Sequence, residues 1–141
     1  MKVSTRGRYA LRLMIDLVRH NTGEFIPLKD IANRQNISEK YLEAIVKLLV
    51  KKQLLLGHRG KNGGYKLSRK PEEYSAWDII SATESEDMAP ISCLEKASSP
   101  CPQADSCPTL PMWKDWQNTM REFFSKYTLD DLARDHSNPE I

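Results

Sequence analysis

Three cysteines are the side chains in this sequence best suited to bind a metal or to react with an oxidant. Cys93, Cys101 and Cys107 are spaced Cys-x7-Cys-x5-Cys. Three thiolates on one irregular loop can converge on a metal ion or an iron–sulfur cluster. The spacing lacks the CxxC pair typical of structural zinc, and the odd number argues against a disulfide framework. The residues alone leave open a cluster, a zinc site, a thiol–disulfide sensor and plain reduced thiols.

A cluster would need a fourth ligand, because the sequence offers three thiols and clusters usually have four protein ligands. The carboxylate of Asp87 or Asp105 could supply it. A histidine or a group from a second subunit are the alternatives. The sequence does not choose among them.

Basic side chains are the second feature with a clear chemical meaning. Residues 1–70 hold 16 Lys and Arg against 5 Asp and Glu, whereas residues 71–141 hold 5 against 14. The whole-chain charge of +2 hides this division. A surplus of cations in one half is typical of a segment that binds nucleic acid.

The elements that would position these cations form a helix-turn-helix. Residues 28–33 predict a short helix, and Ser38 is a good N-cap for a second helix beginning at Glu39. The N-terminal residues of such a second helix read base edges in the major groove. Glu43 could accept a hydrogen bond from cytosine, or pair with a neighbouring lysine, and Tyr41 could instead be a packing residue. The expected DNA contacts of this helix are Ser38, Lys40, Tyr41, Glu43 and Lys47.

A β-hairpin should follow, with strands at 54–58 and 65–67 around the glycine-rich segment 59–64. Placed after a helix-turn-helix, this hairpin is typical of a wing. Arg59 suits the narrow minor groove and Lys61 a phosphate. Three basic residues near the N-terminus are further candidates for phosphate contacts: Lys2, Arg6 and Arg8.

The remaining pattern predicts a mainly α-helical fold with a small β-hairpin, a winged helix-turn-helix plus a C-terminal dimerisation helix. Residues 1–70 would be the DNA-binding domain. Residues 71–141 would hold a short helix, an irregular cysteine loop at about 84–111 and a helix at about 112–127. A helix over 5–20, which Thr5 could cap, and a short helix over 129–134 complete the prediction.

The helix at 112–127 carries one wide aromatic stripe. Helix-turn-helix proteins that read palindromic sites need a twofold partner, so we expect the stripe to bury against a second copy of the chain. Packing within the chain is the alternative. The stripe consists of Trp113, Trp116, Met120, Phe123, Phe124 and Tyr127.

Other classes of protein fit the sequence poorly. No apolar run approaches the ~20 residues of a membrane span, and Met1 to Arg6 lack the apolar core of a signal peptide, so we expect a cytoplasmic protein. No nucleophile–base motif or phosphate-binding glycine loop indicates an enzyme.

Four segments together resemble the IscR, NsrR and CymR family of bacterial winged-helix regulators. They are the opening Ser4–Ala10, the recognition segment Ile37–Glu43, the wing Arg59–Tyr65 and the later Asp78–Ile80. The similarity runs from residue 2 to about residue 135.

The resemblance implies a dimeric transcription factor, with Glu43 and Arg59 in operator recognition. In the cluster-binding branch it implies a [2Fe–2S] or [4Fe–4S] cluster on Cys93, Cys101 and Cys107. The CymR branch lacks this triad, and a regulator of that type would take its signal from a partner protein. The first gap between cysteines is longer here than in the cluster-binding branch. Leu110 stands where IscR has a histidine ligand, and Arg8 lies in the region where NsrR-like members supply a carboxylate.

Overall fold

Helix α1 (Thr5–Arg19) is the central element of the computed structural model, which describes residues 2–84, 88–96 and 98–134. Its apolar side chains recur every three or four residues, and Ala10, Leu13, Met14 and Leu17 are all buried. The N-cap is Ser4, whose Oγ accepts the Gly7 N–H at 3.0 Å, so the expected Thr5 cap is wrong. Ser4 has the extended backbone that an N-cap needs, whereas Thr5 is already helical.

The described chain is mostly helical with a single two-stranded antiparallel hairpin, which confirms the predicted fold class. Short 3₁₀ helices are labelled η. After α1 the elements are α2 (Leu28–Gln35), α3 (Glu39–Lys51), β1 (Leu55–His58), β2 (Gly64–Leu67), η1 (Pro71–Glu73), α4 (Ala76–Thr83), η3 (Ser92–Leu94), η4 (Ala104–Ser106), α5 (Leu110–Ser125) and α6 (Leu129–Ala133).

Helices α2 and α3 form the predicted helix-turn-helix. The chain leaves α2 through Asn36, whose left-handed φ of 53° suits asparagine. Ser38 then caps α3, its Oγ accepting the Tyr41 N–H at 3.1 Å. The apolar side of α3 is buried, at Leu42, Ile45, Val46 and Leu49.

A buried carboxylate locks α1 to α2. Asp16 is 1% exposed, and the Arg34 guanidinium donates to its two oxygens at 2.6 and 3.0 Å. Gln35 Nε2 donates to the same carboxylate at 2.9 Å. The bond to Asp16 raises the pKa of Arg34 above its ordinary value. Because both oxygens are satisfied, the pair holds α2, the first helix of the helix-turn-helix, against α1 without leaving a bare charge in the core.

The hairpin that forms the wing is anchored to the rest of the protein by an isolated β-bridge at Ile26. Strands β1 and β2 pair Leu55 with Leu67 and His58 with Gly64. Ile26 and Tyr65 exchange two backbone hydrogen bonds at 2.9 Å, which joins the α1–α2 connection to β2. Gly64 has a φ of +148°, and a Cβ there would overlap the Ile26 carbonyl, so the close approach requires glycine.

The hydrophobic core continues past residue 70. Tyr74 is buried, and its hydroxyl donates to the Leu54 carbonyl at 2.7 Å. Ile79 of α4 and Leu129 of α6 belong to the same buried cluster as the side chains of α1 and α3. The core therefore extends past the predicted boundary at residue 70, which stays a prediction.

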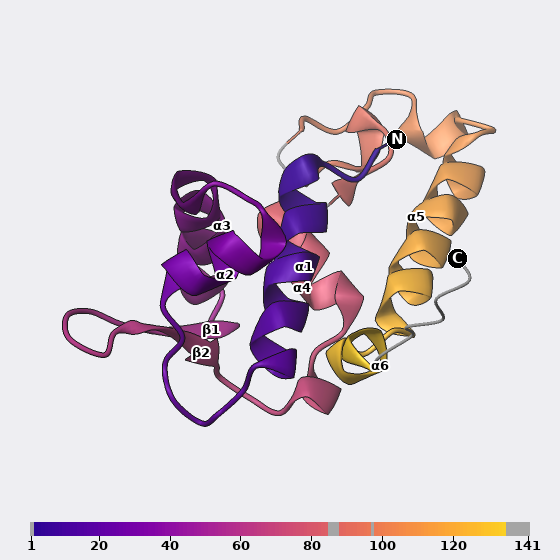
Figure 1. Ribbon diagram of the computed structural model, residues 1–141. Coiled ribbons are helices and arrows are strands. Elements are labelled where there is room, and N and C mark those ends of the chain that lie inside the picture. The colour runs from indigo at the N-terminus through magenta and orange to yellow at the C-terminus, as the bar shows by residue number, and fades with distance from the viewer. Residues whose placement is uncertain (1, 85–87, 97, 135–141) are drawn as a thin grey trace.

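Helix α5 packs on α4, at the opposite edge of the molecule from α3 and the hairpin (Figure 1). A second buried cluster joins Ile80, Met88 and Met120, with Val3 and Phe124 packed against it. None of the helices in the described ranges is both long and apolar enough to cross a lipid bilayer.

Candidate DNA-binding surface and cysteine loop

The residues predicted to contact DNA from α3 are all exposed: Ser38, Lys40, Tyr41, Glu43 and Lys47. Glu43 lines a groove of about 370 Å³ between α3 and the wing, together with Lys47 and His58. No described side chain forms an ion pair with Glu43, so its carboxylate is available as an acceptor. Tyr41 also packs, its ring lying edge-on to Tyr9 at 5.6 Å between centroids.

The wing tip projects away from the body of the molecule (Figure 1). Arg59 and Lys61 on it are exposed. The tip closes through a hydrogen bond from the Gly63 N–H to the Gly60 carbonyl at 3.0 Å. It therefore presents two cations on a turn held by the backbone, a shape suited to a DNA groove.

The N-terminal cations Lys2, Arg6 and Arg8 are exposed too, and the segment that carries them is anchored by Glu84. Glu84 Oε1 accepts the Ser4 N–H at 2.9 Å and the Ser4 hydroxyl at 2.6 Å. This contact joins the start of α1 to the end of α4, where the cysteine loop begins (Figure 1).

Gly7 makes this contact possible. A Cβ at Gly7 would overlap Glu84 Oε1, so glycine leaves the space that the carboxylate occupies. The sequence analysis did not predict a role for Gly7 or for Glu84. A glycine on the buried side of a helix was the one available signal, since glycine weakens helices unless something packs closely against it.

The cysteine loop has little regular structure, as predicted from its composition. Cys93 is exposed, while Cys101 and Cys107 are half-buried, and all three are free. Among the described residues, no three His, Cys, Asp or Glu side chains lie close enough together to hold a metal ion. Asp105 lies on η4 and is exposed, and Asp87, the other candidate fourth ligand, lies outside the described residues.

One of the thiols has a distinct environment. Thr109 Oγ1 lies 3.4 Å from Cys107 Sγ, and hydrogen bonding from Thr109 holds the pKa of Cys107 below the ordinary thiol value. A lower pKa raises the thiolate fraction at neutral pH, and the thiolate is the form that binds metals and attacks oxidants. Cys107 is therefore suited both to binding a metal and to reacting with an oxidant.

The aromatic stripe of α5 divides into two faces, which corrects the expectation that all six side chains point to a partner. Met120 is buried and Phe124 half-buried against the α4 cluster, because α4 lies along that side of the helix. The outward face keeps large exposed side chains: Met112, Trp116, Phe123 and Tyr127. Trp113 is half-buried, with its ring 5.7 Å from that of Trp116.

Comparison with known proteins matches residues 3–135 to the Rrf2 family model, described as an iron-dependent transcriptional regulator. The chain belongs to the Rrf2 family. It is 37% identical to the protein rrf2 of Nitratidesulfovibrio vulgaris over 137 residues, covering 97% of this chain and 90% of that protein.

Solved structures of two Rrf2-type regulators match the fold equally well. The oxidised form of Staphylococcus aureus CymR has a TM-score of 0.73 at 34% identity, covering 98% of this chain and 100% of that one. T. potens IscR also has a TM-score of 0.73, at 32% identity, covering 100% and 92%. The resemblance deduced from the sequence is thus confirmed, and the chain is a transcriptional regulator rather than an enzyme. Because both regulators match equally, the fold does not decide how this Rrf2-family chain senses its signal.

Proposed function

We propose that this chain is a homodimeric repressor that binds a near-palindromic operator and senses iron–sulfur, redox or nitric oxide status through an iron–sulfur cluster on the cysteine loop. One observation carries the proposal. The Ser4–Glu84 contact joins the start of α1, with its DNA-facing cations, to the end of α4, from which the cysteine loop departs.

Operator binding would use two groups of side chains. Glu43 and Arg59 contact bases, which accords with their exposure and with the absence of any ion pair to Glu43 in the described part of the chain. The lysines and the N-terminal arginines contact phosphates and set the register on the duplex. Such a protein works in the cytoplasm, where the operator is accessible.

Dimerisation would use the outward face of α5. Trp116 and Phe123 on α5 are 40% and 50% exposed, and Tyr127, just after the helix ends, is 43% exposed, which is unusual for large aromatic side chains so close together. Pairing two copies through α5 would bury them and place two reading surfaces on one twofold axis.

The cysteine donors fit an iron–sulfur cluster in their chemistry, although the described residues do not form a converged site. Cys93, Cys101 and Cys107 would be the ligands, with a fourth group from Asp105, Asp87, a histidine or the partner. A bound cluster would supply sensitivity to iron, nitric oxide and oxidants. Met88 of the loop belongs to the apolar cluster against which Val3 packs, so an ordered loop would steady the segment that leads into α1.

The decisive experiment is purification without oxygen, with visible spectroscopy and analysis of iron, sulfide and zinc. The parent protein should be brown and contain iron and sulfide, and the triple Cys93/Cys101/Cys107→Ser variant should be colourless. A colourless, iron-free parent would overturn the cluster and leave the DNA-binding proposal standing.

A second candidate function is thiol-based sensing without a cluster. The Thr109–Cys107 contact favours it, since it lowers the pKa of a free thiol, and a relative has been solved in an oxidised form. In that case the iron-free parent would lose or gain operator affinity after mild oxidation, and the triple serine variant would not respond.

Zinc in the parent would indicate a structural metal instead. A CymR-like regulator controlled by a partner protein would keep its regulation in the triple variant.

A further inference from the structure

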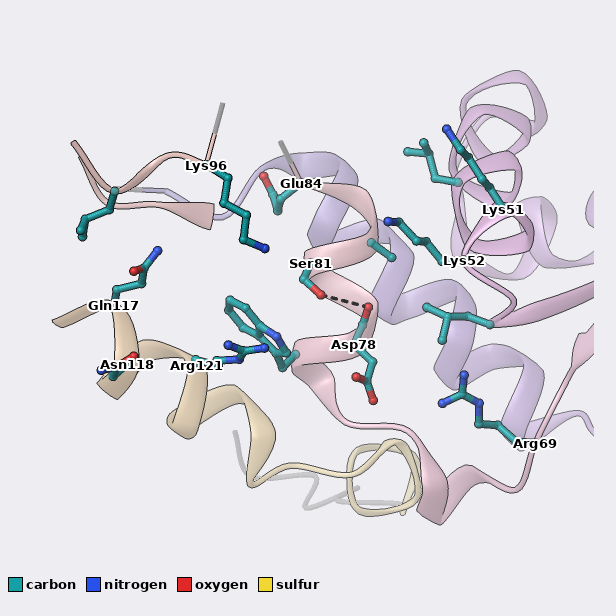
Figure 2. A pocket seen from close by; sticks show the side chains of 15 residues that line it. Lys51, Lys52, Arg69, Asp78, Ser81, Glu84, Lys96, Gln117, Asn118 and Arg121 are labelled. Carbon is teal, nitrogen blue, oxygen red and sulfur yellow. Dashed lines mark hydrogen bonds between the residues drawn. The ribbon is translucent and has the colours of Figure 1, made fainter. Parts of the chain in front are cut away.

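A cavity of about 820 Å³ lies where the helix-turn-helix, α4, the cysteine loop and α5 meet (Figure 2). Lys51 and Lys52 enter it from the end of α3, and Arg121 from α5 on the other side (Figure 2). Arg69, after the wing, and Lys96, on the loop, also line it. Neither the cysteines nor the predicted DNA contacts are part of this lining.

The two carboxylates in the lining are already engaged elsewhere. Asp78 Oδ2 accepts the Ser75 N–H at 2.9 Å in the capping box of α4. Glu84 Oε1 accepts the two Ser4 hydrogen bonds. Five cations therefore face two carboxylates whose oxygens hold backbone and hydroxyl donors, and the cavity has a net positive charge.

The cations of this cavity lack carboxylate partners within the described ranges, except that Lys96 has an interaction of its own. The guanidinium of Arg121 lies 5.5 Å from the Trp77 ring centre, and that of Arg69 lies 5.1 Å from the Tyr74 ring centre. Both guanidinium groups are held by aromatic faces, which leaves their N–H donors free to bind an anion.

Apolar side chains complete the lining. Trp77 offers an aromatic surface, and Leu48, Leu54 and Leu94 lie around it. Gln117 adds amide groups that can fix the orientation of a ligand. Most of the lining is polar or charged, and the apolar side chains form a smaller part of it. The volume lies within the range of about 300 to 1,000 Å³ that small-molecule sites usually have.

We propose that this cavity binds a small organic anion with a planar apolar portion, as an effector site separate from the cysteines. The planar portion packs against Trp77 and the leucines, and the anionic group binds Arg121 and the lysines of α3. Such a ligand bridges the end of the recognition helix, the cysteine loop and α5, and so links the reading surface to the dimer helix. The anionic group would be held by α3 and α5, while the cysteine loop contributes Leu94 and Lys96 to the lining.

The test uses the full chain and an anionic aromatic probe, 8-anilinonaphthalene-1-sulfonate, followed by fluorescence titration. The Lys52→Gln/Arg121→Gln variant should bind the probe about tenfold more weakly than the parent, while Lys126→Gln, which removes an exposed lysine outside the lining, should stay within about twofold. Thermal melts show that each variant is folded.

A competition experiment tests the chemical class. Adenosine monophosphate should displace the probe from the parent, and adenosine, which has the ring but no charge, should displace it much less. Equal probe affinity in the parent and the double variant, no binding by the parent, or equal competition by the two compounds would each overturn the proposal.

Discussion

The DNA-binding surface and the cysteine loop differ in how their functional side chains are held. Glu43 stands on a capped helix whose apolar face is buried in the core, and Arg59 stands on the turn of a paired hairpin. The cysteines stand on a segment whose described residues include the single-turn 3₁₀ helices η3 and η4, and in the described part of the chain the cysteines do not converge. One surface is built before any ligand arrives, whereas the other needs a ligand or an oxidant to become a defined site.

The largest expected effect is a loss of stability on substitution of Asp16, which helps to hold the rigid DNA-binding region. Asp16→Ala removes the buried acceptor of Arg34 and Gln35, and because the Arg34 left behind is exposed to solvent, the free energy of unfolding should fall by about 1.5–3 kcal/mol. The free energy of unfolding is measured by urea denaturation, with circular dichroism as the signal. Asp130→Ala, which removes an exposed pair with Arg134, is the matched control and should change stability much less. Equal losses would mean that the buried pair does not hold the helix-turn-helix.

Removing the wing cation should weaken DNA binding without affecting the fold. Arg59→Ala should reduce operator affinity about tenfold, because Arg59 is an exposed base-contacting candidate on a preformed turn. Gel-shift titration at fixed salt gives the affinity. Lys126→Ala removes the same charge far from the wing and should leave it unchanged. An Arg59→Ala protein with the parent's affinity would remove the wing from the interface.

Gly7→Ala tests the link between the two regions. Alanine normally stabilises a helix by about 0.5–1 kcal/mol over glycine, but here it would displace Glu84 and break charge-assisted hydrogen bonds of about 1.5–3 kcal/mol. We expect a net loss of about 1 kcal/mol in thermal or urea unfolding. In a Glu84→Ala background the same change should stabilise the protein. A loss of similar size in both backgrounds would show that Glu84 is not the cause.

The smallest effect concerns the loop alone. The hydrogen bond between Thr109 Oγ1 and Cys107 Sγ lowers the pKa of that thiol, since the hydroxyl can donate to the thiolate form, so Thr109→Val should raise the pKa. With Cys93 and Cys101 replaced by Ser, alkylation of Cys107 should then be slower at neutral pH, and its pH profile should move upward. Ser106→Ala removes a neighbouring hydroxyl that donates to the Gln103 carbonyl instead, and should leave the profile in place. An unmoved profile in Thr109→Val would contradict the assignment.

Local patterns made the winged helix predictable. The stripe of α3, its Ser38 cap and the glycine-rich turn each depend on residues close together in the sequence. The Ser4–Glu84 contact spans 80 positions, and no local pattern encodes it. The division of the α5 stripe into two faces could not be predicted for a related reason. Periodicity shows that the side chains are apolar, but the position of α4 decides which of them become buried.

The shared core limits how this regulator can be taken apart. Tyr74, Ile79 and Leu129 fill space beneath α1 and the wing, so a fragment ending at residue 70 would expose the apolar surface that they now cover. Residues 1–70 are therefore not expected to fold as an independent domain that could be fused to another protein. Because residues from both halves of the chain share one buried cluster, a substitution after residue 70 can alter the packing of α1 and α3.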